Sequence, residues 1–219
     1  MANVIKLRKG LDVNLKGKAA KEEFQVKKPA VYALMPDDFT GMKPKVVVKE
    51  NDVVKVGDAL FVDKNHPEIK FVSPVSGRVT MVERGDRRKV LSVRVEADAE
   101  LQYVDFGKKS AGQMTAQEVK ALLLESGLFA FFKQRPYDVT ANPTDTPKAI
   151  FVSAFNSMPL AADFEYVLRG READFQAGLD ALAKMAKTYL GVSSKQTATA
   201  LTAAKNVEIN FFDGWSRRV

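Results

Sequence analysis

The first half of the chain alternates short apolar runs with turn-forming residues, and little of it has helical periodicity. Runs of this kind, rich in valine and bounded by Gly, Pro, Asn or Asp, are typical of β-strands. The predicted strands cover residues 30–34, 46–48, 59–62, 69–72, 78–82 and 90–95. The pattern therefore predicts an all-β unit.

A repeated turn signal divides this β region into two similar halves. Asn51-Asp52 and Gly85-Asp86 lie 34 residues apart along the chain. Asn and Gly adopt the left-handed backbone conformation most easily, and a following Asp favours a tight turn. We expect both turns to reverse the chain in the same way.

A helix and a loop follow the β region. Residues 115–126 have apolar positions at helical spacing, and Thr115 and Glu118 have the spacing of an N-terminal capping box. Residues 134–147 contain three prolines and several Asp, Asn and Thr residues. This composition predicts a long loop or a connection between domains.

Strand-like and helix-like patterns alternate in the last third of the chain. The predicted elements are strands at 149–152, 189–192 and 207–211, a helix at 194–204 and, after Gly170, a helix with Phe175, Leu179, Leu182 and Ala186 on one face. The alternation predicts a parallel sheet of the doubly wound type. So few strands would leave the faces of the sheet uncovered. Either the sheet pairs with something else, or the chain is the front part of a longer protein.

The composition excludes several classes of site. The chain of 219 residues has no cysteine, which excludes disulfides, thiolate zinc sites, cysteine-ligated iron–sulfur clusters and a cysteine nucleophile. Its single histidine, His66, excludes sites built from several imidazoles. The carboxylate pairs Asp37-Asp38 and Asp163 with Glu165 lie in turn-like segments, where side chains usually face solvent. We therefore assign no catalytic residue and no metal site.

The charge and hydropathy patterns bear on the choice of partner. Residues 1–28 hold eight Lys or Arg residues against three Asp or Glu residues, within a net charge of +7 for the chain. This basic segment suits an acidic partner, anionic lipid or nucleic acid, or it is a solvated face without a dedicated partner. No nucleic-acid-binding motif accompanies it, so we expect no nucleic acid. No apolar run approaches the about 20 residues needed to cross a bilayer, which predicts a cytoplasmic protein.

Two turn motifs resemble those of the biotinyl/lipoyl carrier family. Residues 53–60 read Val-Val-Lys-Val-Gly-Asp-Ala-Leu, and residues 73–79 read Ser-Pro-Val-Ser-Gly-Arg-Val. The resemblance implies a barrel-sandwich hybrid whose intervening hairpin carries a modified lysine, for which Lys64 is the candidate. The hairpin is slightly longer than a carrier turn, and Pro67 stiffens it. We expect Lys64 to be an ordinary surface lysine, with attachment of biotin or lipoate as the alternative.

A wider set of motifs resembles the A-subunit of the bacterial sodium-translocating NADH:quinone reductases (Na+-NQR). The motifs are Lys9-Gly10-Leu11-Asp12, Asp38-Phe39-Thr40-Gly41-Met42-Lys43-Pro44-Lys45, Leu60-Phe61-Val62-Asp63-Lys64, Ser73-Pro74-Val75-Ser76-Gly77, Arg84-Gly85-Asp86-Arg87-Arg88, Phe151-Val152-Ser153-Ala154 and Pro159-Leu160-Ala161-Ala162-Asp163. The resemblance extends to about Gly214, and residues 215–219 depart from the family pattern.

This resemblance implies a place in a membrane redox complex. Such a complex oxidises NADH, reduces a quinone and exports sodium ions, with its flavins and iron–sulfur centres in other subunits. The A-subunit would be a peripheral, cofactor-poor docking component on the cytoplasmic side of the inner membrane, and would not be catalytic in isolation. Its partners would be the other subunits, with a quinone as a further candidate. The alternative is a carrier-like or scaffold module unrelated to respiration.

The predicted fold class is mixed α and β, in three parts. Residues 1–110 are expected to form a biotinyl/lipoyl-like β domain with a basic N-terminal segment. Residues 111–147 are expected to form a helix and a proline-rich connection, and residues 148–219 an incomplete Rossmann-like α/β part.

The segment after the predicted helix is similar to the flavin-binding loop of respiratory complex I and of Rnf-type complexes. There a Ser-Gly-Leu turn leads into a glycine-rich loop that binds FMN, whereas here bulky residues follow the turn at residues 126–128. Bulky side chains block the close approach of backbone to phosphate, so we expect neither FMN nor NADH to bind. The rings and cations could hold a quinone instead, or the rings could be core. The candidate quinone-binding residues are Phe129, Phe131, Phe132, Lys133 and Arg135.

Overall fold

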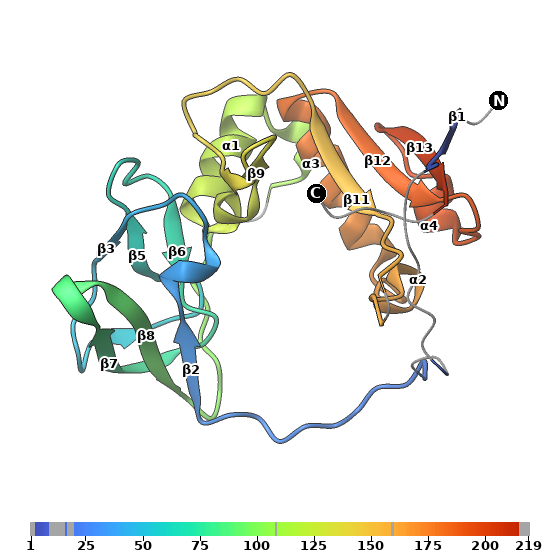
Figure 1. Ribbon diagram of the computed structural model, residues 1–219. Coiled ribbons are helices and arrows are strands. Elements are labelled where there is room, and N and C mark those ends of the chain that lie inside the picture. Colours follow the sequence, from blue (N-terminus) through green and yellow to red (C-terminus); the bar gives the residue numbers. More distant parts are fainter. Residues whose placement is uncertain (1–2, 9–15, 17–19, 108, 159, 215–219) are drawn as a thin grey trace. The chain divides into compact units, whose positions relative to one another are not determined.

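The computed structural model describes residues 3–8, 16, 20–107, 109–158 and 160–214 (Figure 1). The motif at residues 9–12, Pro159 and the divergent residues 215–219 therefore lie outside the described residues. The chain forms two compact units. One, here called the β unit, comprises Val26–Lys108 and Lys120–Thr146, and the other, the α/β unit, comprises Met1–Gln25, Lys109–Val119 and Pro147–Val219.

The β unit is built from two antiparallel sheets. The first has the order β2 (Val31–Leu34), β8 (Val90–Ala97), β7 (Gly77–Arg84) and β4 (Val53–Val54), and the second has the order β3 (Pro44–Val46), β5 (Ala59–Asp63) and β6 (Lys70–Val72). All six predicted strands are present, with ends that shift by up to two residues. Val53–Val54 was not predicted as a strand, because two paired residues are too short to show an alternating pattern.

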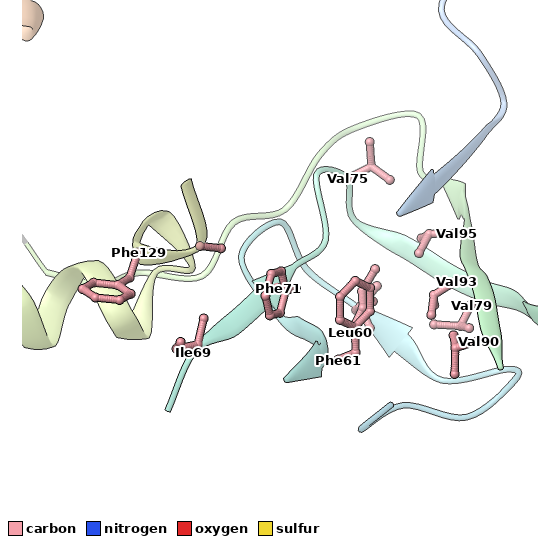
Figure 2. Close-up of a cluster of buried hydrophobic side chains, with 12 residues drawn as sticks. Leu60, Phe61, Ile69, Phe71, Val75, Val79, Val90, Val93, Val95 and Phe129 are labelled. Carbon is pink, nitrogen blue, oxygen red and sulfur yellow. The ribbon is translucent and has the colours of Figure 1, made fainter. Parts of the chain in front are cut away.

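Apolar side chains from both sheets form one core (Figure 2). Strand β5 is buried along four successive residues, so it contributes to packing on both of its faces. In Figure 2, Phe129 enters the cluster from the segment that follows α1, whereas the other labelled side chains come from the strands and turns of the sheets. The core of the β unit thus includes a residue that follows its last long strand by some thirty positions.

Only one of the two predicted turns has the expected conformation. Asn51 is left-handed, with φ of 74°. Gly85 is extended, with φ of −97°, and the left-handed residues of this turn are instead Arg87 and Arg88, with φ of 53° and 62°. The short 3-10 turn at Asp86–Arg88 displaces the reversal by two residues, so the prediction of two equivalent turns is wrong.

The predicted capping box at the start of α1 (Ala116–Glu125) is confirmed. The Glu118 carboxylate accepts from the backbone N–H of Thr115 at 2.8 Å, and the Glu118 N–H donates to the Thr115 hydroxyl at 3.3 Å. The hydrogen bond from the Thr115 backbone, followed by the one from its hydroxyl, lowers the pKa of Glu118. The reciprocal bonds satisfy two backbone donors that the start of a helix leaves free.

The proline-rich segment contains more regular structure than a loop. After η4 (Leu128–Phe131), strands β9 (Lys133–Gln134) and β10 (Val139–Thr140) pair as a small antiparallel hairpin. The prolines of this segment lie outside the paired positions, so they leave the hydrogen bonds of the ladder intact.

The α/β unit contains a four-stranded sheet in which every pair is parallel. The strand order is β1 (Asn3–Lys6), β13 (Glu208–Asp213), β12 (Thr188–Ser193) and β11 (Ile150–Ala154). The sequence-based division grouped the N-terminal segment with the β domain, whereas β1 pairs here with β13, with Lys6 opposite Asp213. A four-residue strand whose partner lies some two hundred residues away leaves no local signal.

The helices of this unit pack on one face of the sheet. They are α2 (Phe164–Val167), α3 (Glu172–Met185) and α4 (Thr199–Thr202). Leu190 and Val192 of β12 are fully buried against Leu179 of α3 and Leu201 of α4. Figure 1 shows α3 running beside the strands that it connects.

The predicted helix at residues 194–204 is shorter than expected. Within this range, only Thr199–Thr202 is helical. The side-chain oxygen of Gln196 accepts hydrogen bonds from the backbone N–H groups of Thr197 and Ala198, both at 2.9 Å. Such local side-chain bonds offer the backbone an alternative to the helix, which delays its start.

Gly127 allows the segment after α1 to approach β6 closely. Its φ is 76°, and a Cβ atom there would lie 2.6 Å from Cγ1 of Val72. Gly107 has a similar φ of 79°, but nothing lies within 4 Å of the corresponding position. An alanine at Gly107 would meet only the energetic cost of a left-handed backbone, whereas an alanine at Gly127 would meet that cost and a close contact as well.

We expect Gly127→Ala to lower the free energy of unfolding of the β unit by about 3 kcal/mol, because it combines a left-handed alanine with an overpacked contact. Gly107→Ala, with the backbone penalty alone, should cost about 1 kcal/mol. Urea denaturation of both variants measures the difference. Equal costs would contradict the close approach of Gly127 to Val72.

Candidate functional site

The five candidate quinone-binding residues divide between the core and the surface of the β unit. Phe129 is buried and belongs to the core cluster, and Phe132 is packed against the same cluster. The two rings stack on each other, with centroids 5.4 Å apart and planes at 23°. Packing thus accounts for two of the three phenylalanines.

Phe131 lies on the surface, where 70% of it is exposed. Its ring meets Phe39 edge to face at a centroid distance of 6.1 Å. Phe39 in turn contacts Phe71 at 4.6 Å, and Phe71 stacks on Phe61 at 5.0 Å. We call these four residues the aromatic column, because their rings form a continuous series from the surface into the core.

The aromatic column is held in place by a 3-10 turn and by a strand from the other end of the β unit. Phe39 follows η1 (Pro36–Asp38), and the next residue, Thr40, accepts hydrogen bonds at its carbonyl from the backbone N–H and the hydroxyl of Thr140, at 2.9 and 3.3 Å. Strand β10 therefore holds the Phe39 loop against the segment that carries Phe131. Sequence reasoning did not assign Phe39 to the site, since no local pattern links residues so far apart.

The two candidate cations follow the exposed ring along the chain. Lys133 lies in β9 and Arg135 in the turn to β10, and both side chains are exposed. Arg135 lies 3.8 Å from the carboxylate of Asp138. Tyr137, which is 74% exposed, shares this turn. The structure thus places Phe131, Lys133 and Arg135 on the surface of the β unit and Phe129 in its core.

The backbone of this segment is already engaged in its own turns. The Ala130 N–H donates to the Gly127 carbonyl at 3.3 Å, and the Phe132 N–H donates to the Phe129 carbonyl at 3.1 Å. A phosphate nest needs successive N–H groups that point at the ligand. These two N–H groups are therefore already bonded within the segment.

The hairpin that carries Lys64 is tied to the neighbouring strand. The backbone N–H of Lys64 donates a hydrogen bond to the Lys43 carbonyl at 2.7 Å. The buried carboxylate of Asp63 accepts from the N–H groups of Lys43 and Asn65, at 3.3 and 3.0 Å. Lys64 is exposed, but its backbone lies beside the start of β3 and is not at the free tip of a two-residue turn.

The described ranges contain neither a metal-binding cluster nor a membrane-spanning helix. Within them, no group of three or more His, Cys, Asp or Glu side chains gathers where it could hold a metal ion. Among the same residues, no helix is long and apolar enough to cross a membrane.

The chain matches two sequence models of one protein family. The model of the NqrA N-terminal barrel-sandwich hybrid domain matches residues 5–98, and that of the NqrA second alpha/beta domain matches residues 114–216. The predicted combination of a carrier-like β module with an α/β part is thereby confirmed.

Curated relatives that are named as the A-subunit of Na(+)-translocating NADH-quinone reductase are similar over most of the chain. The protein from Yersinia pseudotuberculosis serotype O:1b (strain IP 31758) is 35% identical over 217 residues, which is 96% of this chain and 48% of the relative. That from Pseudomonas aeruginosa (strain UCBPP-PA14) is 36% identical over 191 residues, covering 85% of this chain and 42% of the relative. The protein from Serratia proteamaculans (strain 568) is 37% identical over 186 residues, which is 83% of this chain and 41% of the relative.

The chain thus spans about half the length of the curated relatives that it matches. The two domain matches together cover nearly all of it, and the relatives agree with both. The chain therefore belongs to the NqrA family, whose barrel-sandwich hybrid domain and second α/β domain it matches.

Proposed function

We propose that the chain acts as a docking part of the NqrA component in a Na+-translocating NADH-quinone reductase, on the cytoplasmic side of the inner membrane. The complex is inferred from the names of the relatives. The main support for the docking role is the position of Phe131. Its ring is largely exposed and yet is connected to the core through the aromatic column.

An exposed ring with rigid support suits recognition of a partner. Aromatic and Arg side chains dominate the binding energy of protein interfaces, where they fill well-packed, desolvated pockets. Phe131 is held by Phe39, and Arg135 follows within the same turn segment. This chain would contribute contact surface, and the redox centres would lie in other subunits, since a chain without cysteine cannot supply thiolate ligands to an iron–sulfur cluster.

A quinone is the second candidate ligand of the same surface. A quinone ring stacks on aromatic side chains, and its carbonyls accept hydrogen bonds from cations such as Lys133 and Arg135. Phe131 supplies the accessible ring, whereas Phe129 would support the segment from within the core. The quinone candidate therefore rests on Phe131, Lys133 and Arg135.

The carrier alternative depends on Lys64 alone. A ligase needs its substrate lysine at an accessible turn, and the backbone bond between Lys64 and Lys43 restricts this one. We therefore place docking ahead of covalent attachment of biotin or lipoate.

A tagged chain expressed in a bacterium that encodes the other subunits should co-purify with them, and Phe131→Glu should reduce their recovery roughly thirtyfold, as expected for a hot spot worth about 2 kcal/mol. Val53→Glu is the matched control, because Val53 is 72% exposed in the same unit but has no part in the column. Equal recovery with both variants, or no co-purification at all, contradicts the docking role. Thermal unfolding verifies that both variants fold.

A short-chain quinone analogue should raise the melting temperature of the β unit, whereas NADH and FMN should not. At a hundredfold excess over its Kd, a ligand adds about 2.7 kcal/mol of stability, which corresponds to a rise on the order of 10 °C for a unit of this size. Phe131→Ala should abolish the shift, and Phe151→Ala, a change of a 76% exposed ring in the α/β unit, should preserve it. A shift with NADH or FMN argues against this ligand assignment.

Intact mass after co-expression with biotin and lipoate ligases should equal the mass of the unmodified chain. A mass increase that disappears in Lys64→Arg would instead support the carrier alternative. A known carrier domain expressed beside the chain reports whether the ligases are active.

A further inference from the structure

Positive charge is concentrated in the turn that joins β7 to β8 (Figure 1). This turn, residues 84–89, is here called the basic tip. It holds four cations and one carboxylate, all of them exposed: Arg84, Asp86, Arg87, Arg88 and Lys89. The tip lies in the β unit, within one of its two antiparallel sheets.

Most of this charge is not balanced within the protein. Lys89 pairs with the carboxylate of Asp37 at 2.7 Å. Among the described residues, no carboxylate forms an ion pair with Arg84, Arg87 or Arg88. The Arg84 guanidinium donates a hydrogen bond to the Arg88 carbonyl at 3.3 Å, which holds it across the turn. Three guanidinium groups are therefore available to an external anion.

The backbone of the tip does not explain why two of its residues are arginines. Arg87 and Arg88 are both left-handed, with φ of 53° and 62°. Glycine and asparagine adopt this conformation more easily, so arginine lowers stability at each position. Residues held in such conformations cluster at functional sites. The turn alone would favour Asn or Gly, and the arginine side chains need another reason.

An apolar side chain lies at the base of the tip. Leu91 is 38% exposed. A Cβ atom on Gly85 would lie 3.1 Å from Cδ1 of Leu91, so the leucine lies against the backbone of the turn. Arginines beside a partly exposed leucine suit the boundary between charged headgroups and acyl chains, where long cationic side chains keep their charge at the polar surface.

The opposite end of β8 has the opposite charge. Residues 96–107, which begin at that end, contain four Asp or Glu residues and no Lys or Arg. Strand β8 has eight residues, so at ~3.3 Å per residue it separates the two ends by about 25 Å. Such a separation of charge turns the tip toward an anionic surface and the acidic end away from it.

The size of the tip favours lipid over an acidic protein as the partner. A stable protein interface engages about 20–30 residues on each side, many more than the tip offers. Anionic headgroups need no matching surface, since each Lys or Arg near the membrane adds its own attraction. A guanidinium group also binds phosphate oxygens in pairs.

We propose that the basic tip binds the phosphate headgroups of an anionic membrane surface, with Leu91 entering the headgroup layer. The proposal rests on the proposed function only in placing the chain at a membrane, and it uses a surface other than the aromatic column. The ion pair of Lys89 with Asp37 joins the tip to η1, which Phe39 of the column follows directly. Lipid at the tip would thus orient the β unit, while Phe131 meets the other subunits.

Sedimentation with vesicles tests the lipid contact without any other subunit. The 219-residue chain should bind vesicles of equal parts phosphatidylglycerol and phosphatidylcholine, and should not bind phosphatidylcholine alone. Binding should weaken as salt is added, because salt screens attraction between exposed charges. Equal binding to both kinds of vesicle, or binding to neither, overturns the proposal.

A double variant, Arg87→Asn with Arg88→Asn, should lower the affinity for the anionic vesicles roughly thirtyfold, as expected for two cations at such a surface. Because asparagine accepts the left-handed backbone, the melting temperature should stay the same or rise. The matched control, Lys45→Gln with Lys55→Gln, removes the same charge at two exposed positions of the β unit and should change the affinity little.

Three results of this comparison would overturn the proposal. An equal loss in the two double variants would mean that only net charge matters. An unchanged affinity in the arginine variant would assign lipid binding to another basic part, such as residues 1–28. An unchanged affinity together with poorer recovery of the other subunits would assign the tip to an acidic protein partner.

Phe131→Ala separates this proposal from the docking role. It should leave the affinity for the anionic vesicles unchanged, because the aromatic column is not part of the tip. A loss of vesicle binding as large as that of the arginine variant would place the lipid contact at the column and overturn the proposal. Failure of the co-purification with Phe131 intact would affect the docking role alone.

Discussion

The contact of Phe71 with two other rings organises the β unit. Phe71 is 1% exposed, stacks on Phe61 and receives the edge of Phe39. Aromatic pairs of this geometry contribute about 0.5–1.5 kcal/mol each beyond the burial of their area. Because Phe39 also supports Phe131, a surface ring that would otherwise move freely is held through three rings to the strands β5 and β6.

The two units handle apolar surface differently. In the β unit, strands from both sheets and Phe129 enclose a shared core, and the aromatic column reaches solvent at Phe131. In the α/β unit, one side of the sheet is packed against helices and the other side carries two stacked aromatic pairs, in which Phe151 is exposed. The first arrangement leaves one ring of the column exposed at the surface, and the second leaves Phe151 76% exposed on a sheet face.

Local patterns in the sequence were sufficient to predict most of the helices and strands. The features that were not predicted depend mainly on contacts that such patterns do not show. The strands of the β unit, the capping box of Thr115 and Glu118, and the alternation of strands and helices after residue 148 depend on neighbours within a few positions. The start of α4 was missed because the Gln196 side chain competes for backbone N–H groups. Phe39 meets Phe131 because β10 holds the loop at Thr40, and a sequence of similar phenylalanines gives no indication of which ring will face solvent.

The pairing of β1 with β13 also affects how the protein is made. A ribosome releases residues 3–6 long before their partner at residues 208–213, which emerges some two hundred residues later. The β unit, whose strands all lie between these two, can fold during that interval. The earlier strand must meanwhile remain unpaired and solvated. Its exposed Lys6 and the adjoining Arg8 suit that interval, because charge discourages premature pairing with other strands in the crowded cell.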